Sequence, residues 1–279
     1  MNDTSRIAII TCWYGKYPWY FPYYLHSCGY NETVDFYIIT DNTEVIPNKP
    51  NNVKIIHKTL EDIITDASEK LGFTVNIDHP YKLCDFKPAY GFLFPEIIKD
   101  YDFWGQSDLD IIYGNVRDFI DEEMLQKFDF ISLRHDYTTG CFALYKNTPL
   151  MNNFFMRSKD YKKVFSDPKH HCFDECNFVW DALTDGESIF DLDTEIESFT
   201  HIIKKAEQEN EIKAHFDFIL LEGLTGRINF DNGRIFYKNQ FEGILYHLFW
   251  LKKDYKPDKV PSRIPEKYYI SKTRIYHSR

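Results

Sequence analysis

The feature that most constrains the fold is an alternation of short apolar runs with helical patterns at the start of the chain. Runs rich in branched apolar residues lie at 7–13, 34–40 and 53–58. Such runs are typical of strands buried in a parallel sheet. Helical patterns lie at 22–28, between the first two runs, and at 60–71, after the third. Because strand and helix alternate, the sequence predicts an α/β fold built on βαβ units.

Further elements follow without a break in composition. In chain order, we expect a helix at 87–100, strands at 102–105, 128–133 and 141–145, helices at 177–183 and 195–211, and a hairpin at 228–237 around Asp231-Asn232-Gly233. The chain has no internal repeat, low-complexity tract or clear linker. For its 279 residues we therefore predict one continuous domain over 1–251 and a basic, aromatic C-terminal tail over 252–279.

Charge and aromatic content narrow the functional classes. The net charge is −10, from 33 basic and 43 acidic residues, which argues against general nucleic-acid binding. The 24 Phe and 20 Tyr suit a thick core, and they also suit a cleft that stacks on nucleobases or sugar rings.

The cysteines and the N-terminal region indicate the compartment. The six cysteines have no disulfide-scaffold spacing, so we expect mostly buried thiols in a reducing compartment. The first apolar run is short and is followed by Gly15 and Pro18, which predicts neither a signal peptide nor a spanning helix. The expected location is the cytoplasm.

Asp108-Leu109-Asp110 is the most informative short motif. In an extended segment, residues two apart project to the same side, so both carboxylates can approach one cation. Paired oxygen donors suit Mg²⁺ or Mn²⁺. The pair follows an apolar strand, where open α/β sheets bind ligands. Asp191-Leu192-Asp193 repeats the pattern, and we interpret that copy as a solvated loop.

Five stretches of the chain match a known class more closely. They are Ile7–Gly15, Asp35–Asp41, Lys82–Pro88, Phe103–Asp110 and Gly140–Asn147. Over about residues 6–255, the chain resembles the GT-A glycosyltransferases, and in particular a bacterial glycosyltransferase-like family catalogued as a domain of unknown function. The resemblance implies a GT-A-like fold and glycosyltransferase activity. The expected donor is a nucleoside-diphosphate sugar, in particular a UDP-sugar, and the expected acceptor is a hydroxyl of a glycan or lipid-linked molecule. Bacterial surface polysaccharide synthesis is the implied setting.

The resemblance also implies site residues on the donor side. His247 would join Asp108 and Asp110 as a ligand of Mn²⁺ or Mg²⁺, with Lys252 or Lys253 near the diphosphate. The nucleotide side would comprise Thr11, Trp13, Tyr14, Asp41, Lys82, Asp85, Lys87 and Ser107. Packing in the core is the alternative for the residues after the first strand and for His247, and a turn-forming role is the alternative for Asp41.

The segment His170-His171-Cys172-Phe173-Asp174-Glu175-Cys176 allows two interpretations. Its cysteines and histidines could bind zinc, but a second ligand pair is lacking. Alternatively, Asp174 or Glu175 is the base that deprotonates the acceptor, unless Asp174 caps a helix. Arg134 and His135 are also expected on the acceptor side. The sequence leaves open whether the reaction inverts or retains configuration.

Other enzyme classes fit less well. The chain lacks G-x-S-x-G, G-x-x-x-x-G-K and G-x-G-x-x-G motifs, which disfavours α/β-hydrolases, P-loop NTPases and Rossmann dehydrogenases. A sugar nucleotidyltransferase normally has a Gly-rich basic loop, whereas residues 13–18 contain one Gly and one Lys. A non-catalytic carbohydrate-binding protein would explain the aromatic residues, but not the acidic pair together with His247.

The C-terminal segment is strongly basic. Residues 252–279 contain nine Lys or Arg and three acids, interleaved with tyrosines. This composition suits a peripheral contact with an anionic membrane face that presents a lipid-linked acceptor. The alternative is that the segment folds back onto the acidic body.

Overall fold

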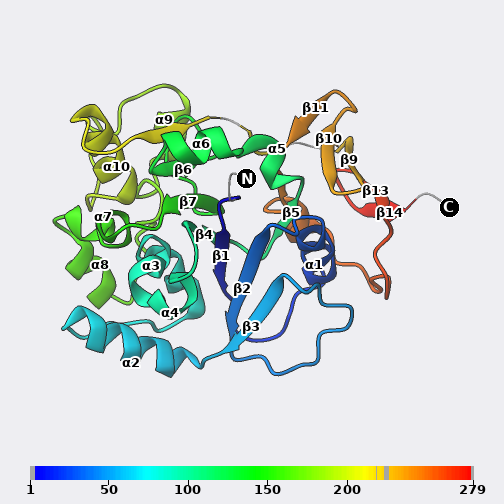
Figure 1. The fold of residues 1–279 in the computed structure, drawn as a ribbon, viewed down its shortest axis with the longest axis horizontal. Helices are drawn as coiled ribbons and strands as arrows, with labels where there is room; N and C mark the ends of the chain where they lie inside the picture. The colour runs from blue at the N-terminus through cyan, green and yellow to red at the C-terminus, as the bar shows by residue number, and fades with distance from the viewer. Residues whose placement is uncertain (1–3, 218, 223–225, 278–279) are drawn as a thin grey trace.

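The core of the protein is a seven-stranded mixed sheet (Figure 1). The computed structural model describes residues 4–217, 219–222 and 226–277. The strand order is β3-β2-β1-β4-β7-β6-β8, and β7 runs antiparallel to β4 and β6 while the other neighbours are parallel. The strands are β1 (Ile7–Cys12), β2 (Val34–Thr40), β3 (Val53–His57), β4 (Phe103–Ser107), β6 (Phe130–Ser132), β7 (Phe142–Lys146) and β8 (Ala214–Phe216).

This architecture confirms the α/β prediction. The N-terminal βαβ half, the acidic pair directly after a strand, and two further strands are all present in the predicted order. These are the features on which the expectation of a GT-A-like fold rests.

Most helices of the described residues have four to six residues. In chain order, the helices are α1 (Phe21–Gly29), α2 (Leu60–Leu71), the 3₁₀ helix η1 (Pro80–Ala89), α3 (Tyr90–Leu93), α4 (Pro95–Ile98), α5 (Val116–Phe119), α6 (Glu122–Lys127), α7 (Pro149–Asn152), the 3₁₀ helix η2 (Phe154–Arg157), α8 (Tyr161–Ser166), α9 (Trp180–Thr184), α10 (Phe199–Gln208) and α11 (Leu251–Asp254). Of these, α1, α2, η1 and α10 are longer. Local sequence fixes α2 well: a Thr59–Asp62 capping box begins it, and Gly72 in the left-handed conformation ends it.

Three predicted helices differ from the structure. The helix expected at 87–100 is divided among η1, α3 and α4, because Pro88 lies in η1 and Pro95 begins α4. The helix expected at 177–183 begins only at Trp180, after two residues with positive φ. The helix expected at 195–211 is confined to α10, which begins after a capping box at Ser198.

A second sheet lies at one end of the molecule (Figure 1). Its order is β11-β10-β9-β13-β14, formed by β9 (Ile228–Asp231), β10 (Arg234–Tyr237), β11 (Phe241–Gly243), β13 (Lys267–Ile270) and β14 (Ile275–His277). The β9–β10 hairpin confirms the predicted turn at 231–233. The segment 252–279, expected to be a tail, instead contributes two strands, and Tyr268 stacks on Phe230 with ring centroids 4.7 Å apart.

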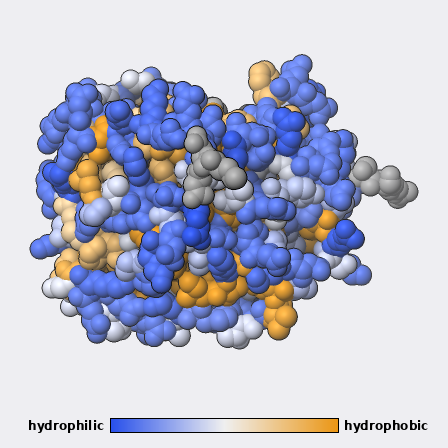
Figure 2. Space-filling view, viewed as in Figure 1, coloured by the Kyte–Doolittle hydropathy of each residue, from blue (hydrophilic) through white to orange (hydrophobic). Residues whose placement is uncertain are grey.

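The molecular surface in Figure 2 is mainly hydrophilic, with apolar residues in separate patches. Among the described residues, no helix combines the length and apolar character needed to cross a membrane. All six cysteines are free, and four of them are buried.

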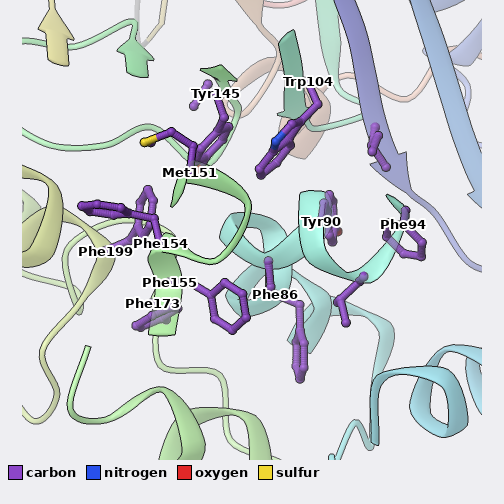
Figure 3. Close-up of a cluster of buried hydrophobic side chains, with 14 of the residues drawn as sticks. Phe86, Tyr90, Phe94, Trp104, Tyr145, Met151, Phe154, Phe155, Phe173 and Phe199 are labelled. Carbon is purple, nitrogen blue, oxygen red and sulfur yellow. The ribbon is translucent and has the colours of Figure 1, made fainter. Parts of the chain in front are cut away.

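Alternate residues of the main strands pack into two different cores. Ile10, Ile39 and Trp104 belong to one face of the sheet, whereas Ile9 and Phe36 belong to the other. Figure 3 shows the first core, in which the rings of Trp104 and Tyr145 stack in parallel with centroids 4.0 Å apart. Because both faces are covered, the strands are largely apolar, and the acidic pair Asp108 and Asp110 lies just beyond the end of β4.

Candidate active site

A cavity of about 840 Å³ lies at the carboxyl ends of β1 and β4. Trp13 and Tyr14 from the end of β1 line it, as do Ser107, Asp108 and Asp110 from the end of β4. A larger cavity of about 1250 Å³ lies between α1 and residues 260–266, but none of the predicted site residues lines it. The smaller cavity is therefore the candidate active site.

A two-stranded sheet brings His247 next to the acidic pair. β5 (Ile111–Tyr113) begins directly after Asp110 and pairs antiparallel with β12 (Leu245–His247), with Ile111 opposite His247. In addition, the Leu248 N–H donates to the Asp110 carbonyl at 2.8 Å. One possible ligand atom each from Asp108, Asp110 and His247 lies within 4.8 Å of the others. This arrangement could hold a divalent cation.

Asp110 is a buried carboxylate between two cationic partners. Its Oδ2 lies 2.5 Å from Lys252 Nζ and 3.2 Å from His247 Nε2. Burial opposes the charged form, but the charges and hydrogen bonds of His247 and then Lys252 outweigh it and hold the pKa of Asp110 well below its usual range. Asp110 is therefore ionised at neutral pH, as a metal ligand must be.

Sequence reasoning missed Glu222. His247 Nδ1 lies 2.5 Å from Glu222 Oε1, so the opposite ring nitrogen faces Asp110. Residues 219–222 run beside β12: the Leu221 N–H donates to the Leu245 carbonyl at 2.8 Å, and the His247 N–H donates to the Leu221 carbonyl at 2.9 Å. A lone Glu in a short irregular segment has no local signal that would reveal this contact.

The Lys87 ammonium lies between Asp108 and Asp174 in the cavity. Its buried Nζ donates to Asp108 Oδ1 at 2.6 Å and to the Gly140 carbonyl at 2.9 Å, and it lies 3.5 Å from Asp174 Oδ2. Burial raises the pKa of Asp174 well above its ordinary value, with the charge of Lys87 opposing this shift. Lys87 thus lies in the cavity as predicted, beside both the acidic pair and the acceptor-side carboxylates.

Asp174 and Glu175 both line the cavity, but they are held differently. Glu175 accepts from the Gly140 N–H at 2.9 Å and from Trp180 Nε1 at 2.7 Å, so both of its oxygens are engaged. The residue that flanks the N-terminus of α9 is Val179, so Asp174 does not cap a helix as the alternative proposed. A Cβ at position 140 would lie 2.5 Å from Asp174 Oδ2, so this close approach requires glycine.

Lys82 and Asp85 do not line the cavity. They form a buried ion pair at 2.8 Å, and Asp85 also accepts from the backbone N–H groups of His171 at 2.9 Å and Phe173 at 2.8 Å. The Lys82 ammonium also donates to the Val164 carbonyl at 2.7 Å. The pair therefore anchors the segment that carries Asp174. The resemblance had instead implied that Lys82 and Asp85 contact the nucleotide.

The remaining predicted residues divide into two groups. Trp13, Tyr14, Ser107, Arg134 and Lys252 line the cavity, whereas Thr11, Asp41, His135 and Lys253 do not. Asp41 instead accepts from the Gly15 N–H at 2.8 Å, and Lys253 Nζ lies 3.8 Å from the ring centroid of Phe249. Within the described ranges, Asp108, Asp110 and His247 are the only group of three or more potential metal ligands, so the zinc interpretation of residues 170–176 gains no support.

The Lys82–Asp85 pair predicts a pH-dependent stability. Burial opposes ionisation of Asp85, but His170 and then Lys82 outweigh it and lower its pKa. A depressed carboxyl pKa contributes stability above the unfolded pKa of about 4, and this is lost as the pH falls. We expect Asp85→Asn to lower the free energy of unfolding by about 3–5 kcal/mol near neutral pH and by less below pH ~4. Urea unfolding across this range measures the difference.

The control for this prediction is Asp191→Asn, which changes an exposed loop carboxylate. It should alter the free energy of unfolding by less than about 0.5 kcal/mol at every pH. An Asp85→Asn penalty that stays constant with pH would contradict the assignment.

Comparisons with known proteins complete the description. Similar solved structures include the galactosyltransferase LgtC in complex with donor and acceptor sugar analogs (TM-score 0.35, 12 % identity, 58 % of this chain and 66 % of that chain). Another is mouse xyloside xylosyltransferase 1 in its apo form (TM-score 0.43, 9 % identity, 87 % and 97 % of the two chains). The aligned region spans just under two thirds of LgtC. No curated protein sequence matches the chain. The model of a family of unknown function, DUF6625, matches residues 9–279, and the chain therefore belongs to that family.

Proposed function

We propose that the protein is a metal-dependent glycosyltransferase that uses a nucleoside-diphosphate sugar. The observation that supports this most directly is the group formed by Asp108, Asp110 and His247, within a cavity that also contains Asp174. A cation site and a separate carboxylate in one cavity meet the two needs of the reaction: stabilising a leaving diphosphate and deprotonating an acceptor.

The residues fit a divalent cation of the Mn²⁺ or Mg²⁺ kind. Two carboxylates and one imidazole offer hard oxygen donors and a nitrogen donor, and the nitrogen favours Mn²⁺ over Mg²⁺. When bound, such a cation supplies positive charge that stabilises the departing diphosphate. Glu222 fixes the ring of His247, as partners of metal-bound histidines commonly do.

The chain's own residues supply the rest of the donor site. Lys252, which is next to Asp110, is suited to contact a diphosphate oxygen as a point charge. Trp13 and Tyr14 line the part of the cavity at the end of β1 and are suited to stack on the base, which we propose to be uracil.

Asp174 is the better candidate for the base. Both oxygens of Glu175 already accept hydrogen bonds, whereas the Asp174 carboxylate lies 3.5 Å from Lys87 Nζ, beyond a short hydrogen bond. A raised pKa brings a carboxylate closer to the operating pH, which favours proton transfer. Asp174 would accept the acceptor's hydroxyl proton while the acceptor oxygen bonds to the anomeric carbon and the bond to the diphosphate breaks. This role implies inversion of configuration.

The acceptor proposed from the resemblance is a hydroxyl of a glycan or lipid-linked sugar in bacterial surface polysaccharide synthesis, in the cytoplasm. Peripheral membrane contact is not included in this proposal, because the basic C-terminal segment forms strands of the second sheet.

One assay separates this function from its alternatives. The protein is incubated with labelled UDP-, GDP- and dTDP-sugars and Mn²⁺, and release of nucleoside diphosphate is followed. A glycosyltransferase hydrolyses its donor slowly. A sugar nucleotidyltransferase instead forms pyrophosphate from a nucleoside triphosphate and a sugar phosphate, and a carbohydrate-binding protein changes neither set of compounds.

Neutralising the acidic pair should abolish cation binding. Asp110→Asn and Asp108→Asn keep side-chain size but remove one negative ligand each, so we expect the affinity for Mn²⁺ to fall by more than about 100-fold. Calorimetry with Mn²⁺, with and without UDP, measures this. The control is Asp193→Asn in the second Asp-x-Asp motif, which is exposed in a loop. Unchanged Mn²⁺ affinity in either variant would contradict the site.

Changing Glu222 should weaken the cation site without removing a ligand. Glu222→Ala frees the His247 ring to rotate, and loss of such a partner typically costs about 10–100-fold in metal affinity. We expect Glu222→Gln to recover part of this loss, because its amide oxygen can still accept from Nδ1. Glu242→Ala, which removes the surface partner of Arg234, is the control. Equal Mn²⁺ affinities for the protein and Glu222→Ala would show that Glu222 does not position His247.

Removing the base should separate transfer from donor binding. For Asp174→Asn, we expect the transfer rate to fall by about 10²–10⁴-fold while the UDP–Mn²⁺ affinity is retained. Product configuration is read by NMR in the same experiment. A retained configuration, or normal transfer by Asp174→Asn, would exclude this residue as the base.

A further inference from the structure

We propose that the cavity contains a saccharide-binding platform formed by the rings of Tyr81, His170, Phe178 and Trp180, and that the acceptor is bound there as a pyranose. This inference rests on the proposed function and deepens it, because it names the chemical class of the acceptor. We call these four side chains the aromatic platform.

The four rings form a continuous chain of edge-to-face contacts. The ring centroids of Tyr81 and His170 are 4.8 Å apart, those of His170 and Phe178 are 5.6 Å apart, and those of Phe178 and Trp180 are 5.5 Å apart. Tyr81, His170 and Trp180 line the cavity. Nevertheless, Tyr81 is 61 % exposed and Phe178 is 44 % exposed. Large rings that contact one another yet remain open to solvent are typical of binding sites.

The backbone adopts an unfavourable conformation to present Phe178. Asn177 has φ 53° and Phe178 has φ 69°, in the left-handed region that bulky side chains rarely adopt. Asn177 holds this turn: its Nδ2 donates to the His171 carbonyl at 2.9 Å, and its Oδ1 accepts from the Glu195 N–H at 2.7 Å. Strain that the surroundings maintain in this way concentrates at ligand-binding sites.

Carboxylates hold two other members of the aromatic platform, His170 and Trp180. Asp85 Oδ1 lies 3.2 Å from His170 Nδ1, and the ion pair with Lys82 holds Asp85 in place. Trp180 Nε1 donates to Glu175 Oε2 at 2.7 Å. The rings of His170 and Trp180 are therefore held in place before a ligand arrives, which lowers the entropic cost of binding.

The charges beside the aromatic platform favour a sugar over a nucleotide. Glu175, which holds Trp180, and Asp174 line the cavity beside the aromatic platform. Carboxylates accept hydrogen bonds from sugar hydroxyls, whereas a phosphate needs positive charge such as Lys252 supplies beside Asp110. A pyranose has C–H groups on its faces and hydroxyls around its edge. The negative faces of aromatic rings attract the C–H groups, while the carboxylates receive the hydroxyls. A hydroxyl held near Asp174 is also where the proposed base needs it.

The test measures binding of simple sugars by saturation-transfer NMR. The probes are methyl glycosides of glucose, galactose, mannose and N-acetylglucosamine, with UDP and Mn²⁺ present. We expect at least one glycoside to bind, with strongest saturation transfer at ring C–H protons. Tyr81→Leu and Phe178→Leu keep apolar bulk but remove the ring face, so each should weaken that binding by about two- to tenfold. The matched control is Phe241→Leu, which changes an exposed ring on β11 outside the cavity.

The outcomes distinguish the possibilities. Loss of glycoside affinity in both leucine variants, with unchanged UDP affinity by calorimetry, supports the aromatic platform. If no glycoside binds, or if the leucine variants bind like the control, the inference is wrong. If the leucine variants instead lose UDP affinity, the rings hold the base and the inference is also wrong. The protein could also bind glycosides through these rings and yet hydrolyse no nucleotide sugar. That result would support the aromatic platform and contradict the proposed glycosyltransferase function.

Discussion

Carboxylates gathered in one cavity repel one another, and the arrangement of this site depends on how Lys87 offsets that repulsion. Its buried ammonium group lies between Asp108, from the end of β4, and Asp174, from a segment far along the chain, and it also binds the carbonyl of Gly140. Without a positive charge at this point, two acidic groups would have to share a poorly solvated space. The ammonium lets Asp108 and Asp174 lie within one cavity.

The N-terminal half of the fold could be predicted because its signals are local. Each early strand is a run of branched apolar residues, and α2 has its own capping box and terminal glycine. In the second sheet, the β9–β10 hairpin has a local signal in Asp231-Asn232-Gly233, whereas β13 and β14 have none. In 267–270, alternation of buried and more exposed residues matches a strand, but the nine Lys or Arg of the surrounding segment 252–279 suggested a tail. Prolines 88 and 95 likewise divide a segment whose apolar content alone favoured one helix.

Asp108 and Asp110 could be predicted as site residues because they directly follow an apolar strand, β4, in the sequence. His247 and Lys252 came from the resemblance alone, because only the pairing of β5 with β12 brings them to the acidic pair. Glu222 was missed for the same reason. For Lys82 and Asp85, the resemblance implied nucleotide contacts. In the structure the two side chains form a buried ion pair that contacts backbone groups and lies outside the cavity.

The second sheet has a consequence for the entropy of the site. β11 and β13 belong to the same sheet, so the chain between them, residues 244–266 with β12 and α11, has both ends fixed. His247 in β12 and Lys252 in α11 belong to that segment. Fixing both ends removes most of the conformations that an open segment would sample, and this cost is met when the sheet forms rather than when a ligand binds. Strands with no residue in the cavity thereby limit the conformational freedom that His247 and Lys252 have left to lose.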